Sequence, residues 1–420
     1  MWRQIRDREA GENHPKAFRS HVEARRITGL QLSNQKDVIS PHKGSINSLQ
    51  IDLTEGRYLL SAASDASTAV FDIQRPTEYD GNGTAKHNCV FSIDKQHVGC
   101  HMFSVSSAVW YPVDTGVFVT GSYDHCIKVW DTNTTQVVTQ FKMPGKVYRV
   151  AMSPLATSHM LIAAGSEDVQ VRLCDISSGA FSHTLSGHRD GVMAIEWSKS
   201  SEWVVITGGW DGAIRFWDIR RVGSFRVLDQ SKCQTGRRLP VLSRASSSNK
   251  PRSQETRKSG GGSGLRLRLH PGLHSALDRA TAHYGVVTGL KATQDGLYLL
   301  SSGSDSRIRL WDMGSSCNTL VNYETSRLQT SKGIQMATTP DSSLLFVPCM
   351  ASFKAFDVWS GETLGTFTGH YECVNSCCFN SCEQEIYTGG NDRQILVWSP
   401  GRWIPDEDGR AAMDGDSWSD

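Results

Sequence analysis

The sequence predicts an all-β fold, a seven-bladed β-propeller that follows a short helical N-terminal extension. Three observations support this prediction. A segment recurs along the chain, four residue types keep the same spacing in its copies, and the repeat length is about 42 residues. A period of roughly 40–45 residues is typical of propeller blades, each of which is a four-stranded antiparallel sheet.

Four copies of the segment align without gaps. Each has small residues, then an aspartate, then an alternating apolar stretch that ends six residues later at a tryptophan. A serine or threonine lies four residues before the aspartate, and a histidine lies 22 or 23 residues before it. This is the pattern of WD repeats, and we expect the four side chains to form a hydrogen-bonded tetrad that satisfies buried polar groups. The expected tetrads are His101, Thr120, Asp124 and Trp130; His188, Thr207, Asp211 and Trp217; His283, Ser301, Asp305 and Trp311; and His370, Thr388, Asp392 and Trp398.

Three weaker copies share the same frame. The first has His42 and Asp65 but carries a phenylalanine in the position of the tryptophan. The second keeps Asp168 and has Cys174 in that position, and the third, residues 344–359, keeps only the alternation of a strand. Together the copies predict seven blades within a propeller domain of residues 27–399.

The last copy stops after its third strand, so a fourth strand must come from elsewhere. Residues 27–33 place Leu30 and Leu32 at the two-residue period of a strand just before the first blade. We expect this segment to pair with the last blade and to close the ring, which also removes open sheet edges.

No catalytic, metal or cofactor site is predicted. Histidine, hydroxyl and carboxylate resemble a hydrolase triad, but a fourfold recurrence at structural spacing argues against catalysis. The cysteines of residues 369–383 match no common zinc spacing, and a strand there would place Cys377 and Cys378 on opposite faces.

Charge is concentrated in segments outside the repeats. The net charge is only +1, but residues 222–281 carry +9 and are rich in Ser, Gly, Lys and Arg. They predict a basic flexible insertion between blades four and five, and residues 400–420 predict an acidic disordered tail. The insertion lacks the interleaved aromatic residues that stack on bases, so we expect no specific nucleic-acid recognition. No segment is apolar enough to span a membrane.

Residues 1–26 do not fit a blade. Trp2 with Ile5, and Phe18 with Val22, form two narrow apolar stripes at helical spacing. The segment is either a frayed terminus or a helical hook that docks in the groove of a partner.

The chain resembles the Cockayne syndrome group A family of WD-repeat substrate receptors. The resemblance rests on residues 109–134, on residues 171–189, on the stretch RFWDIRR at 215–221 and on residues 346–362. Among the Trp-Asp pairs at 130, 217 and 311, only the second continues into x-Arg. The long basic insertion is a departure from the family, expanded relative to its other members.

The resemblance implies a non-catalytic subunit of a cullin-4 RING ubiquitin ligase. Such receptors bind the damage-binding triple-propeller adaptor of cullin-4, and the cullin and the RING protein indirectly. The implied role is transcription-coupled nucleotide excision repair in the nucleus, with the group B remodelling ATPase at stalled RNA polymerase II. The adaptor-binding residues implied here are Trp2, Ile5, Phe18, Val22, Trp217, Asp218 and Arg220. The alternative is a WD-repeat scaffold or chromatin-associated protein without a ligase.

Substrate is expected on the opposite face of the propeller. Arg220 follows the third strand of its blade, at the end away from the aspartate turns, and the residue before each aspartate projects at the other rim. Tyr123, Trp210 and Asn391 occupy such positions and are the candidate substrate-binding residues. The alternative for Trp210 is that it packs on a neighbouring loop.

Overall fold

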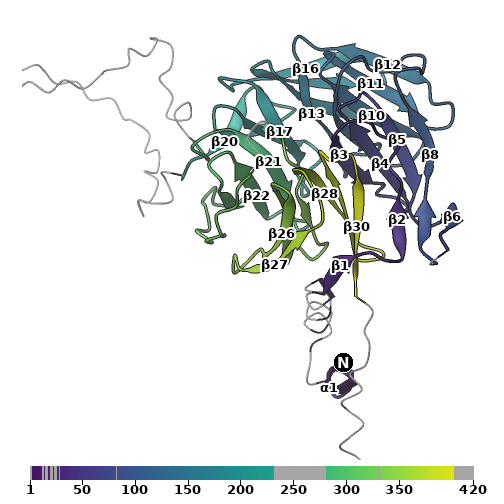
Figure 1. Cartoon of the computed structure of the whole chain (residues 1–420). Coiled ribbons are helices and arrows are strands. Elements are labelled where there is room, and N and C mark those ends of the chain that lie inside the picture. Colours follow the sequence, from purple (N-terminus) through teal and green to yellow (C-terminus); the bar gives the residue numbers. More distant parts are fainter. Residues whose placement is uncertain are drawn as a thin grey trace, which may run out of the picture.

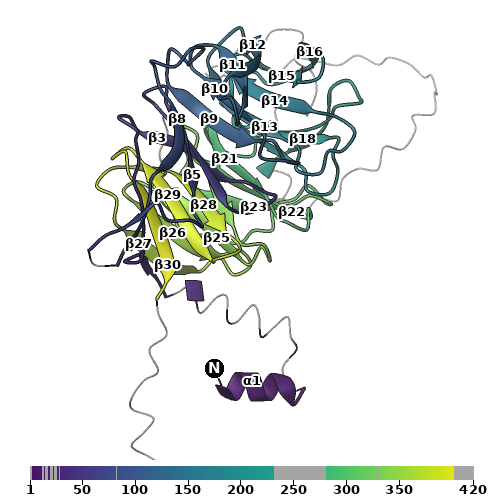
Figure 2. The same ribbon diagram turned by 90° about the vertical axis from the view of Figure 1, so that its right-hand side faces the viewer.

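The structure is a computed structural model of the chain. It describes residues 2–11, 14, 18, 22, 26–27, 29–81, 83–230, 281–328 and 332–401. These residues form seven sheets arranged around a central channel, and together they make a β-propeller (Figures 1 and 2). Among the described strands, all pairs are antiparallel except β2 with β7 in the seventh sheet. The prediction of an all-β propeller is confirmed.

The first four sheets follow one another along the chain. The first sheet contains β3 (Ile46–Ile51), β4 (Tyr58–Ala63), β5 (Thr68–Asp72) and β8 (Cys89–Ile93). The second contains β9 (Val105–Trp110), β10 (Val117–Ser122), β11 (Cys126–Asp131) and β12 (Val137–Lys142). The third contains β13 (Val147–Met152), β14 (Leu161–Ser166), β15 (Gln170–Asp175) and β16 (Ala180–Ser186). The fourth contains β17 (Val192–Trp197), β18 (Val204–Gly209), β19 (Ile214–Asp218) and β20 (Ser224–Leu228).

Three further sheets complete the ring. The fifth contains β21 (Val287–Ala292), β22 (Tyr298–Gly303) and β23 (Ile308–Asp312). The sixth contains β24 (Ala337–Thr338), β25 (Leu344–Cys349), β26 (Ser352–Asp357) and β27 (Thr363–Thr368). The seventh contains β28 (Val374–Asn380), β29 (Glu385–Gly390) and β30 (Ile395–Pro400), with β1 (Leu30–Leu32), β2 (Lys36–Val38), β6 (Glu78–Tyr79) and β7 (Ala85–His87).

The hydrophobic core lies between the faces of neighbouring sheets. Phe118 of β10 and Trp130 of β11 stack with ring centroids 6.1 Å apart. They belong to one buried cluster with Leu60 and Val70 of the first sheet. The alternation of each strand therefore supplies two apolar faces, one to each neighbouring sheet, as stacked sheets require.

The innermost strands hold the ring together around the channel. The side-chain amide of Asn47 on β3 donates to the carbonyl of Val105 on β9, at 2.7 Å. The amide of Asn375 on β28 donates to the carbonyl of Ile46 at 2.8 Å, so the last sheet is joined to the first. These bonds satisfy buried groups at the narrow part of the ring.

The predicted closing strand is present. β1 pairs antiparallel with β30, with Leu30 opposite Pro400 and Leu32 opposite Trp398. Leu30 is buried, whereas Leu32 is exposed. The same sheet is extended by β2, which pairs with both β30 and β7, and by β6; these strands were not expected from the sequence.

The predicted start of the basic insertion at residue 222 is wrong. Strand β20 is the fourth strand of its sheet and pairs with β19 from Ile214 opposite Leu228 onward. The backbone N–H of Gln230 donates to the carbonyl of Thr281 at 3.0 Å, so the chain on either side of residues 231–280 meets at one point. The basic composition of the region concealed an ordinary outer strand, and the rest of the predicted insertion lies outside the described residues.

Near the N-terminus, α1 (Trp2–Glu9) is a helix that lies apart from the sheets (Figure 2). Phe18 and Val22 are also helical, and the other residues predicted as a helical extension lie partly outside the described ranges. The predicted tail starts one residue early, because Pro400 belongs to β30, and residues 402–420 are outside the described part. No helix in that part is long and apolar enough to cross a membrane.

Candidate functional site

Each of the four predicted tetrads is brought together by hydrogen bonds. In the second sheet, His101 Nδ1 lies 2.8 Å from Asp124 Oδ2, and His101 Nε2 lies 2.7 Å from Thr120 Oγ1. The indole N–H of Trp130 donates to the same hydroxyl at 2.8 Å. The same chain of contacts, with distances from 2.7 to 3.2 Å, recurs in the sets that begin at His188, His283 and His370.

The electrostatics of the tetrads suit a structural role. Burial lowers the pKa of His101, and the hydrogen bond with Asp124 only partly opposes this effect. Burial alone would raise the pKa of Asp124, but the hydrogen bond and charge of His101, together with the backbone N–H bonds from Met102 and Cys126, outweigh it, so the pKa is lowered. A neutral imidazole then donates to the carboxylate and accepts from the threonine hydroxyl. All members of the set are thus satisfied, and the buried hydroxyl presents no free nucleophile.

The first sheet contains a variant of the tetrad that the sequence did not reveal. Ser67 stands between His42 and Asp65, with its hydroxyl 2.5 Å from His42 Nδ1 and 2.5 Å from Asp65 Oδ1. His42 Nε2 lies 2.6 Å from the hydroxyl of Ser61. Because the hydroxyl of Ser67 separates the imidazole from the Asp65 carboxylate, the effect of burial dominates and lowers the pKa of His42 to about 4.

Arg220 is held at the end of β19 by its own chain. Its Nε and Nη2 donate to the two carboxylate oxygens of Asp218 at 3.0 and 2.9 Å. The guanidinium carbon lies 5.1 Å from the ring centroid of Trp203, a cation–π distance. Asp218 is buried, whereas 56% of the Arg220 side chain is exposed. The result is an ordered cation at the surface rather than a freely moving one.

The aspartate at this position caps a turn in most sheets, and in two of them an arginine guanidinium donates to it: Arg57 to Asp72 in the first sheet and Arg220 to Asp218 in the fourth. Asp131 and Asp312 accept hydrogen bonds from hydroxyls three residues later, Thr134 and Ser315, at 2.7 and 2.6 Å. In the fourth sheet the guanidinium of Arg220 takes the place of that hydroxyl. Trp203, which supports the guanidinium, was not singled out from the sequence, although it directly precedes β18.

The predicted substrate-binding residues each directly follow the second strand of a sheet: Tyr123 follows β10, Trp210 follows β18 and Asn391 follows β29. Trp210 is 40% exposed and stacks on Tyr148 with centroids 5.8 Å apart. The ring of Tyr123 meets that of Tyr148 edge-on, with centroids 5.9 Å apart. The three rings form a continuous aromatic cluster over the second, third and fourth sheets. Asn391 belongs to the seventh sheet, where it accepts a hydrogen bond from Asn375 at 2.9 Å.

Tyr148 is the member of this aromatic cluster that sequence reasoning missed. It lies on β13, in the copy that lacks the histidine and the tryptophan of the repeat, so no spacing pointed to it. The alternative considered for Trp210, packing on a neighbour, is thus partly realised through Tyr148.

The N-terminal candidates are placed in part. Ile5 of α1, Phe18 and Val22 are each half-buried. The guanidinium carbon of Arg8 lies 5.4 Å from the ring centroid of Phe18, so the end of α1 contacts the following helical residues. The backbone places Trp2 at the start of α1.

The sheets and tetrads define a WD-repeat β-propeller, and comparison with known proteins agrees. The family model for the WD domain, G-beta repeat, matches residues 87–131, 179–218, 277–312 and 361–399. The chain is 60% identical to WD repeat-containing protein ATCSA-1 of Arabidopsis thaliana over the full length of both proteins. It therefore belongs to the family of WD-repeat proteins that includes ATCSA-1, in accord with the resemblance to Cockayne syndrome group A proteins.

More distant relatives share the repeat. Autophagy-related protein 16 of Arabidopsis thaliana is 24% identical over 77% of this chain and 60% of its own length. Radiation-sensitive protein 28 of Saccharomyces cerevisiae is 27% identical over 29% of this chain and 25% of its own length.

Proposed function

We propose that the chain is the substrate-recognition subunit of a cullin-4 RING ubiquitin ligase, active in transcription-coupled nucleotide excision repair in the nucleus. It would catalyse no step itself. One face would bind the damage-binding triple-propeller adaptor, and through it the cullin and the RING protein. The other face would hold the substrate, with the group B remodelling ATPase and stalled RNA polymerase II as partners. Likeness to ATCSA-1 and to the group A family supports this role.

The ordered guanidinium of Arg220 is the observation that carries the proposal. Asp218 occupies two of the N–H directions of Arg220, and arginine has five donors, so further donors remain for a partner. Side chains that are already ordered lose less entropy on binding, and arginine is frequent among residues that dominate the energy of interfaces. A turn cap alone requires only a hydroxyl, as the second and fifth sheets show.

The finer architecture forms part of the proposal. The seven sheets would be the seven blades, and α1 with Phe18 and Val22 would be the helical hook that enters the adaptor. An amphipathic helix that docks in a groove presents apolar residues at helical spacing. Ile5, Phe18 and Val22 are only half-buried, which leaves apolar surface for such a contact.

The test is co-purification with the adaptor. Arg220→Ala combined with deletion of residues 1–22 is expected to abolish binding, and Arg220→Ala alone to weaken it by about tenfold or more. The melting temperature of the propeller should stay unchanged, because Arg220 is largely outside the core. Arg221→Ala is the matched control, since Arg221 is 74% exposed and lies 3.6 Å from Asp218.

Full retention of adaptor binding by the double change would contradict the proposal. The chain would then be a WD-repeat scaffold or chromatin-associated protein that is not tied to a ligase. Affinity purification before and after ultraviolet damage separates these two functions, because only the receptor should recover the ligase subunits.

A further inference from the structure

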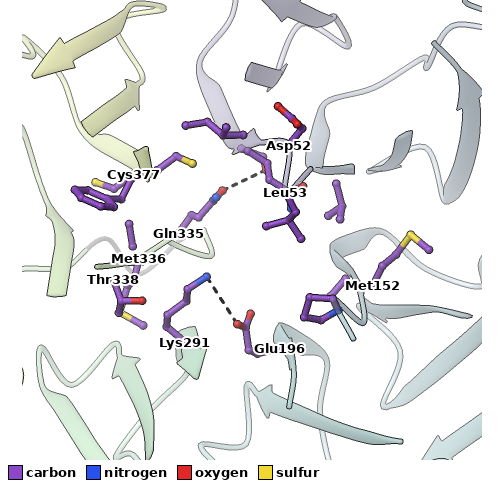
Figure 3. Close-up of a pocket in the computed structure, with 18 of the residues that line it drawn as sticks. Asp52, Leu53, Met152, Glu196, Lys291, Gln335, Met336, Thr338 and Cys377 are labelled. Atoms are coloured by element: carbon purple, nitrogen blue, oxygen red, sulfur yellow. Dashed lines mark hydrogen bonds and ion pairs between the residues drawn. The ribbon is translucent and has the colours of Figure 1, made fainter. Parts of the chain in front are cut away.

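The central channel of the propeller contains a cavity of about 370 Å³. It is lined by the first strands of the seven sheets and by the loops that join those strands to the second ones (Figure 3). These loops, such as residues 52–56, lie on the same face as Arg220. A cavity of this size is within the range of small-molecule sites.

Three cations from adjacent sheets line one wall of the cavity. They are Arg149 on β13, Lys199 just after β17 and Lys291 on β21. Glu196 of β17 is the nearby acid, and its Oε1 lies 3.8 Å from the Nζ of Lys291. Within the described residues, no other ion pair involves any of these three cations. One carboxylate therefore faces three positive charges, and Figure 3 shows it beside Lys291.

The energetics of this wall are unfavourable without a counterion. Burial lowers the pKa of Lys199, and repulsion from Lys291 lowers it further against the attraction of Glu196. Burial likewise lowers the pKa of Arg149. Charges that leave water lose hydration free energy, and like charges close together add a penalty. An anion in the cavity would offset both costs.

The acids of the opposite wall cannot serve as that anion. Asp52 lies across the cavity from Lys291 and Glu196 (Figure 3), and its carboxylate accepts four backbone N–H bonds within its own loop. Glu55 of the same loop is exposed to solvent. The excess positive charge thus stays on the wall formed by the third, fourth and fifth sheets.

We propose that this cavity binds a small anion with two or more negative charges, of the phosphate class. Arg149, Lys199 and Lys291 would contact the phosphate oxygens, and the bound anion would tie three adjacent sheets together across the channel. The anion is either a free phosphorylated small molecule or a phosphorylated side chain of another protein. Size and enclosure favour the free molecule. The proposal does not depend on the role in a ubiquitin ligase.

The test uses the full chain and pyrophosphate as the probe, at constant ionic strength. Isothermal titration calorimetry should show one site, and thermal unfolding should show a melting temperature that rises with pyrophosphate concentration. Lys199→Gln and Lys291→Gln should each weaken binding by about tenfold or more. Glu196→Gln should tighten it, because it removes the carboxylate that competes with the anion.

Lys142→Gln is the matched control, because Lys142 is exposed on β12 and far from the channel. This variant should bind pyrophosphate with the same affinity as the unmodified chain. A phosphoserine peptide measured in parallel distinguishes the two sources, since the tighter ligand identifies which one the cavity accepts. The proposal is overturned if neither probe binds, or if Lys199→Gln, Lys291→Gln and Glu196→Gln all bind as the control does. The lysine variants should lose affinity and the glutamate variant should gain it. A general loss of folding would weaken binding in all of them, so these opposite changes exclude it.

Discussion

Ser67 separates the ring of His42 from the carboxylate of Asp65, whereas the other tetrad histidines contact their aspartates directly. The consequence is a neutral, buried imidazole whose pKa is about 4. In the unfolded chain the same histidine has a pKa of about 6.5. Its contribution to stability is therefore complete above about pH 6.5, and it is lost as the pH falls from there toward 4.

We predict that His42 lowers the free energy of unfolding by about 2 kcal/mol when the pH falls from 7.5 to 5, because its pKa is lower in the folded than in the unfolded chain. Urea unfolding at the two pH values measures the free energy. His42→Gln should show a pH dependence smaller by that amount, and His183→Gln, which changes an exposed histidine of β16, should behave as the unmodified chain. Equal pH dependence in all three proteins would show that His42 does not lose a proton on folding.

Ring closure is the feature to test at the scale of elements. Leu30 of β1 is 5% exposed and packs in a cluster with Phe353 and Trp398, whereas Leu32, two residues on, is 46% exposed. Leu30→Ala should lower the free energy of unfolding by about 2–4 kcal/mol through a cavity in that cluster. Leu32→Ala, the matched control, should cost less than about 1 kcal/mol. Chemical denaturation measures both, and equal costs would mean that β1 does not close the ring.

The sequence was sufficient to predict β1. The last copy of the repeat lacks a fourth strand, and a short alternating segment before the first copy supplies a strand that belongs to no other sheet. It was not sufficient for β2, β6 and β7, since the parallel pairing of Lys36–Val38 with Ala85–His87 joins segments about fifty residues apart without any repeated pattern. The insertion was predicted to start before β20, which is in fact part of the fourth sheet. That boundary was inferred from the basic composition of the segment and not from the periodicity of its residues. Tyr148 was missed because its copy had lost the signature residues.

At the scale of the whole molecule, the antiparallel register of β18 and β19 separates two surfaces. Gly208 pairs with Ile214 at the end near Trp210, and Val204 pairs with Asp218 at the end near Arg220. An aromatic surface and an ordered cation therefore lie at opposite ends of the strands of one sheet, and so on opposite faces of the propeller. Two partners could bind without competing.

We predict that Tyr123→Ala combined with Trp210→Ala weakens substrate capture by about tenfold or more and leaves adaptor binding unchanged. Pull-down of the two partners by the same variant measures the separation. Tyr79→Ala is the control, since Tyr79 of β6 is an exposed ring that lies outside the aromatic cluster. Loss of the adaptor with retention of the substrate would show that the two faces are assigned in reverse.

The bond between Gln230 and Thr281 has a consequence for engineering and for evolution. The backbone nitrogen of Gln230 and the carbonyl oxygen of Thr281 lie 3.0 Å apart at the rim of the ring, although fifty residues separate the two in sequence. Each doubling in the length of a flexible loop costs only about 0.6 kcal/mol, so the ring is nearly indifferent to how much chain is placed between those points. A reporter domain whose N- and C-termini lie close together can therefore be inserted at this junction, and both faces of the propeller stay free.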